Sequence, residues 1–205
     1  DLESYGKPLI FVDSNTLYLG HSCVTTDLED SVITALEYFL DHGHKEIGLL
    51  VGQEETADAT PLQMDPRQRT FQQFLTEKGL YEERFVSVGQ FSTESGYQMM
   101  EQLIQALGDD LPTAFFMASD ALAVGALRSL QEHQIAIPDR VSLISFNDTS
   151  IAKYVFPALS TVTVYTEEMG KQAIQMLRQA FQGNQPSVPY MVKLATKLTI
   201  RDSSR

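Results

Sequence analysis

The feature that most constrains the fold of this 205-residue chain is an alternation of short apolar segments with amphipathic ones. Residues 47–51 and 141–146 are apolar enough to form strands covered on both faces, whereas segments between such runs carry apolar residues at helical spacing. Strands alternating with helices predict a parallel sheet with helices on both faces and right-handed crossovers. The expected strands are 9–12, 22–25, 47–51, 85–88, 113–117, 141–146, 161–164, 191–194 and 197–200.

The helix boundaries are marked by local chemistry. Asp65 followed by Pro66 has the pattern of an N-cap before proline at the first helical position. Gly43 and Gly79 are natural stops for the helices before them. The first expected helix begins after residues 26–29 and ends at Gly43. The other expected helices cover 66–78, 93–107, 120–130 and 167–181.

Composition excludes several classes of function. The formal net charge is −12, whereas a surface that binds duplex nucleic acid or anionic lipid needs a basic patch. No apolar run approaches the ~18–20 residues that span a bilayer, and residues 1–20 lack the pattern of a secretory signal. Cys23 is the sole cysteine, and the four histidines are scattered, so we expect no disulfide, no metal site and no cofactor.

Polar residues follow several of the expected strands. Asp13 follows the first strand, Asn147 and Asp148 follow residues 141–146, and Phe91 follows another strand end. Arg67 falls in the first turn of a helix. In an open parallel sheet, ligands bind at the carboxyl ends of the strands. Carboxylate, amide and guanidinium groups beside an aromatic ring suit a neutral polyhydroxylated ligand.

Each of these residues also has a plainer interpretation. Arg67 fits a solvated or ion-paired side chain, Phe91 a core residue, and Asp13 and the pair Asn147-Asp148 fit turns. Ser119 and the aspartate after it fit a helix N-cap or a phosphate cradle.

Enzyme motifs are missing from the sequence. It has no Gly-x-Ser-x-Gly, no Walker loop and no Gly-x-Gly-x-x-Gly. A hydrolase using Asp13 and Asp148 as paired carboxylates is the enzymatic alternative. We expect binding without catalysis, and hence no catalytic residue.

Five blocks of sequence resemble the effector-binding core of the lactose/galactose-repressor family of bacterial transcription regulators. They occur in the family's order and spacing, and the resemblance extends over nearly the whole chain. Residues 141–162 look most like galactose-operon and β-galactoside-type repressors. The blocks read GHKEIGLLVG (43–52), PTAFFMASDALAVGALRSL (112–130), IPDRVSLISFND (137–148), PALSTV (157–162) and KLTIRDSS (197–204).

The resemblance implies a periplasmic-binding-protein-like α/β fold, with two Rossmann-like lobes, each with a parallel sheet, joined by three crossovers around a sugar cleft. It implies that residues 7–26 plus 164–185 are the remnant of an N-terminal lobe that is incomplete in this fragment. Residues 27–163 plus 186–205 are then the C-terminal lobe. The family's DNA-binding headpiece is expected to be absent, in agreement with the acidic charge.

The resemblance also implies which residues bind the ligand. Asp13 matches the family's cleft aspartate, and Phe91 matches an aromatic residue that stacks on the ligand. Arg67 matches an arginine that precedes a glycine–aromatic pair by three residues, although Thr70-Phe71 stands at that pair here. Ser119 and Asn147 stand where the family usually has asparagine and aspartate. The implied ligand-binding set is Asp13, Arg67, Phe91, Ser119 and Asn147.

The function implied is that of a sugar-sensing effector-binding domain of a repressor. A sugar such as galactose in the interlobe cleft would shift the orientation of the lobes and thereby the affinity for operator DNA. The expected protein is a cytoplasmic homodimer that contacts operator DNA through its headpiece and has no membrane partner. The alternative is a periplasmic-type sugar-binding protein of a transporter, which shares the architecture.

Overall fold

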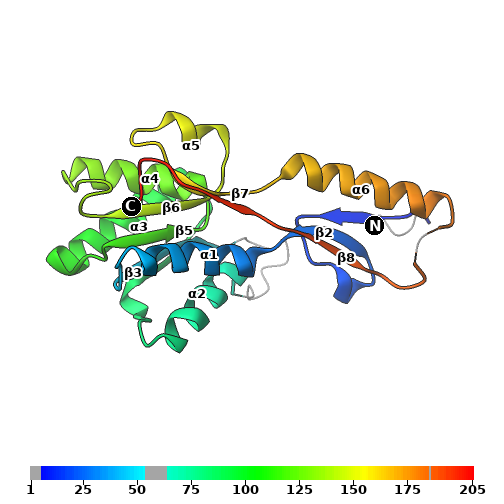
Figure 1. Cartoon of the computed structure of the whole chain (residues 1–205), viewed down its shortest axis with the longest axis horizontal. Helices are drawn as coiled ribbons and strands as arrows, with labels where there is room; N and C mark the ends of the chain where they lie inside the picture. The colour runs from blue at the N-terminus through cyan, green and yellow to red at the C-terminus, as the bar shows by residue number, and fades with distance from the viewer. Residues whose placement is uncertain (1–5, 54–63, 185) are drawn as a thin grey trace. The chain divides into compact units, whose positions relative to one another are not determined.

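The computed structural model of the chain describes residues 6–53, 64–184 and 186–205 and divides into two compact units (Figure 1). Unit 1 comprises Asp1–Asp27 and Val164–Thr196, and unit 2 comprises Leu28–Thr163 and Lys197–Arg205. The chain therefore passes between the units three times. Each unit has its own sheet and is described by itself.

Unit 2 is built on a six-stranded sheet of order β4-β3-β5-β6-β7-β9. The first five strands in this order are mutually parallel, and β9 runs antiparallel to β7. The order reverses between β3 and β5, which is the switch point where ligands bind in open α/β sheets. The strands are β3 (Ile47–Gly52), β4 (Val86–Gly89), β5 (Ala114–Met117), β6 (Ser142–Asn147), β7 (Ser160–Thr163) and β9 (Lys197–Thr199).

Helices cover both faces of this sheet, as the alternating pattern predicts. The helices pack in two pairs (Figure 1). One pair is α1 (Leu28–Asp41) with α2 (Pro66–Glu77), and the other is α3 (Thr93–Leu107) with α4 (Asp120–Glu132). The α3–α4 crossing is close because Gly125 lacks a side chain; a Cβ there would overlap the carbonyl oxygen of Thr93. The core between the layers is fully apolar in β3 and β5, whose residues are all buried.

A short helix, α5 (Ser150–Tyr154), follows β6 in a stretch where the sequence analysis expected no helix. It begins after Thr149, whose backbone amide and hydroxyl both bond the buried carboxylate of Asp120. Asp120 is 29 residues away in the sequence, so the local pattern of residues gives no sign of these hydrogen bonds or of the helix that they support.

Unit 1 is a three-stranded parallel sheet of order β1-β2-β8 with one long helix packed on it. The elements are β1 (Ile10–Val12), the 3-10 helix η2 (Leu17–Leu19), β2 (Ser22–Thr26), α6 (Thr166–Phe181) and β8 (Met191–Leu194). Its core consists of Val24 from β2 and three residues of α6, namely Met169, Ala173 and Met176.

The expected division of the chain was wrong for residues 186–196. The sequence analysis grouped them with the larger lobe, as the family resemblance implied. The structure pairs β8 with β2 in unit 1, with Val192 beside Val24, and only β9 joins the sheet of unit 2. Residue 185, where the smaller lobe was expected to end, lies outside the described residues.

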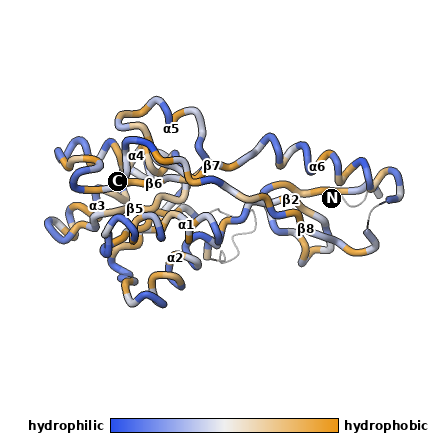
Figure 2. The backbone as a smooth tube through the Cα atoms, in the orientation of Figure 1, coloured by the Kyte–Doolittle hydropathy of each residue, from blue (hydrophilic) through white to orange (hydrophobic). Residues whose placement is uncertain are grey.

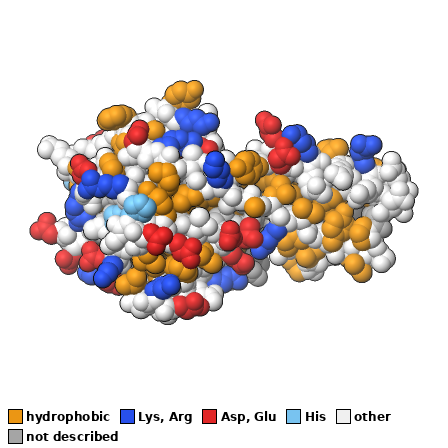
Figure 3. All heavy atoms as spheres, in the orientation of Figure 1, with side chains coloured by type: hydrophobic (Ala, Val, Ile, Leu, Met, Phe, Trp, Pro, Cys, Tyr) orange, Lys and Arg blue, Asp and Glu red, His pale blue; other side chains and the backbone are white. Residues whose placement is uncertain are grey.

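The surface agrees with the composition. Figure 2 shows hydrophobic strands inside unit 2 and helices that alternate between hydrophilic and hydrophobic residues. On the face that Figure 3 shows, acidic and basic side chains are interspersed and do not form a basic patch. Among the described residues, none of the helices is both long and apolar enough to cross a membrane.

Candidate ligand-binding site

Four of the five predicted ligand-binding residues belong to unit 2, at the carboxyl end of its sheet. Phe91, Ser119 and Asn147 follow or end β4, β5 and β6, and Arg67 opens α2, the helix after β3. Parallel strands present their carboxyl ends at one edge, so these four residues share that edge. Asp13 belongs to unit 1 and is described separately below.

Arg67 is held rigidly at this edge by Asp65. The Asp65 carboxylate caps α2 by accepting the backbone N–H of Arg67 at 2.8 Å. It also accepts Nε and Nη2 of the Arg67 guanidinium at 2.9 and 2.7 Å, a bidentate ion pair in which both side chains are 13% exposed. Nη1 donates to the carbonyl oxygen of Ala118, just after β5, at 2.6 Å. The expected alternative of an ion-paired arginine is therefore confirmed, and the same arginine lies at the switch point.

Two aromatic rings face the same guanidinium. The Cζ atom of Arg67 lies 4.8 Å from the centroid of the Phe91 ring and 5.3 Å from that of Phe146. Such distances are typical of cation–π contacts. Gly52, at the end of β3, makes room for Phe91, because a Cβ at Gly52 would overlap the ring. Phe91 is half-buried and thus differs from a core residue such as Phe146, which is 2% exposed.

Ser119 acts as a helix N-cap. Its buried hydroxyl accepts the backbone N–H of Leu122 at 3.2 Å at the start of α4. The plainer of the two interpretations of Ser119 is therefore the one that the structure displays. A hydroxyl that accepts this bond still has its own hydrogen to donate.

Asn147 is the exposed last residue of β6, with a φ angle of 110°. Within the part of the chain that the structure describes, its side-chain amide forms no hydrogen bond. A non-glycine residue at positive φ is uncommon, and such strained positions gather at ligand sites. The amide is therefore an available donor and acceptor beside the switch point.

Asp148 has a structural role. One of its oxygens accepts Nη2 of Arg201 at 2.7 Å, and the other accepts the hydroxyl of Thr163 at 2.9 Å. The Arg201 and Asp148 side chains are 16% and 10% exposed. A carboxylate occupied in this way is a poor nucleophile or general acid, which argues against the paired-carboxylate hydrolase.

Asp120 organises the edge and was not singled out by the sequence analysis as more than a cap. It is 1% exposed, and its carboxylate accepts four hydrogen bonds from three residues. The donors are the hydroxyls of Ser145 (2.5 Å), Thr161 (3.1 Å) and Thr149 (2.8 Å), together with the Thr149 amide (2.6 Å). These bonds fix the turn that carries Asn147. An aspartate at the first position of a helix gave no sign of them, because the donors are 25 to 41 residues away.

Asp13 directly follows β1 in unit 1. It is exposed, has a φ angle of 63°, and donates its backbone N–H to the carbonyl oxygen of Val24 at 2.9 Å. Its ligand role stays a prediction drawn from the resemblance.

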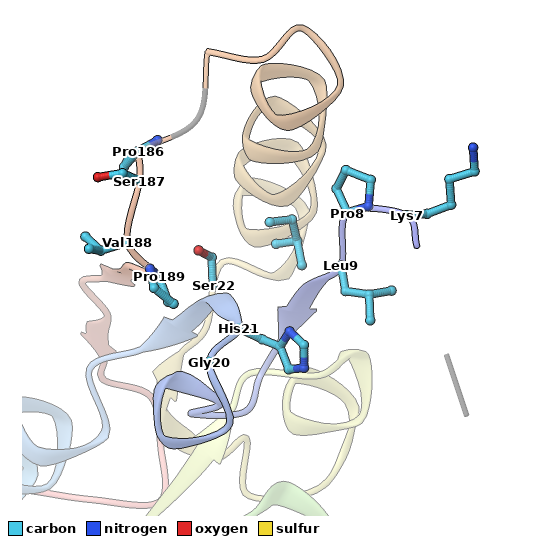
Figure 4. A pocket seen from close by; sticks show the side chains of 11 residues that line it. Lys7, Pro8, Leu9, Gly20, His21, Ser22, Pro186, Ser187, Val188 and Pro189 are labelled. Atoms are coloured by element: carbon cyan, nitrogen blue, oxygen red, sulfur yellow. The ribbon is translucent and has the colours of Figure 1, made fainter. Parts of the chain in front are cut away.

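Two further hollows lie away from the predicted residues. One, of about 450 Å³, lies in unit 1 near the amino ends of β1 and β2 (Figure 4). It is lined by residues that include His21, Ser22 and Pro189. The other, of about 280 Å³, lies between α1 and α2 and is lined in part by Thr70, the residue that replaces the family's glycine. The described residues contain no group of histidine, cysteine and acidic side chains that could hold a metal ion.

Comparison with known proteins identifies the family. The model of the periplasmic binding protein-like domain matches residues 36–204. The chain is 50% identical over 204 residues to the HTH-type transcriptional regulator GalR of Streptococcus thermophilus, covering 100% of this chain and 61% of that protein. It thus spans about three fifths of the length of that relative.

Solved structures agree with this assignment. A regulatory protein of the LacI family from Chloroflexus aggregans superposes with a TM-score of 0.85 at 25% identity, covering 100% of this chain and 71% of that one. The complex of the transcriptional regulator CelR with cellobiose gives a TM-score of 0.83 at 26% identity, with coverages of 98% and 60%. The chain therefore belongs to the periplasmic binding protein-like family, among the domains found in lactose-repressor-type transcriptional regulators.

Proposed function

We propose that this chain is the sugar-sensing effector-binding domain of a DNA-binding transcriptional repressor. The observation that carries the proposal is the Arg67 guanidinium, fixed at the switch point of the unit 2 sheet with Phe91 and Phe146 against it. It is an arrangement for holding a ligand.

The chemistry of the edge suits a neutral sugar. Of the five guanidinium N–H groups, three are bonded to Asp65 and Ala118, so that two remain for the hydroxyls of a ligand. Phe91 offers a ring to the apolar face of a pyranose, and the Asn147 amide donates and accepts. We assign ligand contacts to Arg67, Phe91, Ser119 and Asn147 in unit 2, and to Asp13 in unit 1.

The relatives favour a regulator over a component of a transporter. Those reported above are named as transcriptional regulators, and one was solved with cellobiose. A ligand regulates DNA binding by having different affinities for two conformations of the whole protein. The net charge of this chain is −12, which disfavours contact with DNA. We therefore assign operator binding to a helix-turn-helix part such as the one in the name of the GalR relative. Such a protein works in the cytoplasm, where its operator lies.

Dimerisation of unit 2 through α5 is part of the proposal. Ile151, Tyr154 and Phe156 are 44%, 84% and 84% exposed, and all three lie within one six-residue segment, 151–156. Clustered exposed apolar residues mark interaction surfaces on soluble proteins. A second copy of the same chain is the proposed partner.

Titration calorimetry tests the ligand. Galactose, lactose and other neutral sugars are titrated into the protein, and at least one is expected to bind. Arg67→Ala should abolish binding and leave the fold intact. Arg69→Ala, an exposed arginine two residues further along α2, is the matched control and should bind as the wild type does. A folded wild-type protein that binds no sugar would contradict the proposal.

A further inference from the structure

The charge of Arg67 is already neutralised before any ligand arrives. Asp65 forms two short bonds to the guanidinium, and the pair is shielded from water, with both side chains 13% exposed. Arg201, the next guanidinium near the edge, is likewise paired with Asp148 at 2.7 Å. Asp120 adds a third carboxylate. Lys197 on β9 pairs in register with Thr163 at the end of β7.

The ion pair occupies one of the two guanidinium edges through which arginine binds an anion. Phosphate and carboxylate groups bind arginine through two parallel N–H bonds. Asp65 occupies the edge of Arg67 formed by Nε and Nη2, and Nη1 already donates to Ala118. One N–H group on Nη1 and one on Nη2 are left, and an anion that accepted them would lie next to the negatively charged carboxylate of Asp65.

The start of α2 is also occupied. Helix N-termini are natural binding sites for anions, because their backbone N–H groups have no partners within the helix. Here Asp65 is the N-cap, and its Oδ1 accepts the Arg67 amide at 2.8 Å. Three bonds, one from the backbone and two from the side chain, thus fix the same carboxylate, so that it does not swing aside for an incoming anion.

From this geometry we infer that Asp65 is a specificity-determining residue, which restricts the ligand to neutral polyhydroxylated molecules and rejects phosphorylated or acidic sugars. The inference rests on the proposed sugar-binding function and narrows its ligand class. Asp65 acts through Arg67 and is a positioning residue. An anion in place of the sugar would meet a carboxylate instead of a free cation.

Asp65→Asn tests the assignment while keeping the cap. Asparagine caps helices as well as aspartate does, so α2 should still form. Galactose and galactose 6-phosphate are titrated into both proteins by calorimetry. The wild type should bind galactose and bind galactose 6-phosphate at least about tenfold more weakly. In Asp65→Asn, the ratio of the two affinities should shift toward the phosphorylated sugar by about 10- to 100-fold, the worth of one charge-assisted bond.

Asp139→Asn is the matched control. Asp139 is also paired with an arginine, Arg205, but the pair is exposed and precedes β6, at the opposite end of the strand from Asn147. This variant changes the net charge equally and should leave the ratio of affinities unchanged. A shift as large as that of Asp65→Asn would mean that net charge alone sets the selectivity and would overturn the inference.

Inorganic phosphate provides a readout that does not depend on the identity of the sugar. Phosphate should shift the NMR signals of the α2 amides in Asp65→Asn and leave them in place in the wild type. If the wild type binds galactose but neither the ratio nor the phosphate response changes in Asp65→Asn, the role of Asp65 is refuted and the proposed function stands. If the wild type binds no sugar, the proposed function fails. The phosphate response of the α2 amides then tests by itself whether Asp65 keeps anions away from Arg67.

Discussion

Arg67 donates from Nη1 to the carbonyl oxygen of Ala118 at 2.6 Å and thereby ties the start of α2 to the end of β5. The two residues are 51 positions apart in the sequence. The bond crosses the switch point of the sheet, so that the side chain proposed to hold the ligand is also a structural tie. Substitutions around Arg67 should therefore separate effects on stability from effects on binding.

Removing the cap of α2 should cost stability. In Asp65→Ala, the Arg67 amide loses its acceptor and the guanidinium loses its counterion, so we expect a loss of about 1–2 kcal/mol in the free energy of unfolding. Asp65→Asn keeps the cap and should lose less than about 0.5 kcal/mol. Urea denaturation followed by circular dichroism measures both. Equal losses in the two variants would show that the charge, and not the cap, stabilises α2.

Gly52, which faces the Phe91 ring, should matter for binding. A Cβ at Gly52 overlaps the Phe91 ring, so Gly52→Ala should push the ring away from Arg67 and weaken sugar binding about fivefold, since one ring contact with a ligand is typically worth about 1 kcal/mol. Calorimetry with the sugar that the wild type binds measures the effect. Gly170→Ala on α6 is the control, because the space beside that glycine is open. Unchanged affinity in Gly52→Ala would show that the ring position is irrelevant to the ligand.

Much of the fold could be predicted from sequence because the determining signals are local. Apolar runs, an aspartate before proline, and glycines after helices each act within a few residues, and they placed the strands and helices of unit 2, apart from α5, within one or two residues. The edge that holds Arg67 and Phe91 followed from the rule that ligands bind at the carboxyl ends of parallel strands.

What sequence could not show depends on partners distant along the chain. Phe146 was expected only as a buried strand residue, yet its ring lies over Arg67. Asp120 was expected as a cap, yet it collects donors from β6, β7 and the turn between β6 and α5. The place of β8 depended on pairing with β2, which lies 168 residues away. Such contacts carry no local signature.

The α5 surface should mediate self-association. Tyr154→Asp places a charge on a side chain that is 84% exposed in a proposed apolar contact, so the protein should become monomeric by light scattering while the wild type is dimeric. Tyr18→Asp, in unit 1, changes a tyrosine that is 81% exposed and should stay dimeric. A wild type that is monomeric at all concentrations would contradict the dimer.

A pH dependence should arise between α3 and α4. The pKa of Glu101 is lowered from its ordinary value of 4.5, first because the Ser129 hydroxyl donates to it at 2.7 Å and next because His133 bonds it at 3.0 Å. A carboxylate with a lowered pKa stabilises the fold above its unfolded-state pKa, and this stability is lost as the pH falls through its folded-state pKa. Ser129→Ala should therefore raise the pKa of Glu101 and reduce the loss of stability below pH ~4.5.

An NMR titration of the Glu101 carboxyl carbon measures this shift. Ser150→Ala, an exposed serine at the start of α5, should leave the pKa of Glu101 unchanged. If Ser129→Ala leaves it unchanged as well, the Ser129 hydrogen bond is not the cause of the lowered pKa.

The buried carboxylate of Asp120 should be the most sensitive polar group at the edge. Asp120→Ala removes the shared acceptor of Ser145, Thr149 and Thr161, so that buried donors lose their partner and the turn bearing Asn147 loses its anchor. We expect a loss of about 2–4 kcal/mol in the free energy of unfolding, and weaker sugar binding in the protein that still folds. Asp139→Ala, which removes an exposed ion pair with Arg205, should cost less than about 1 kcal/mol. Urea denaturation compares the two variants, and equal losses would show that the four hydrogen bonds to Asp120 contribute no more than a surface pair does.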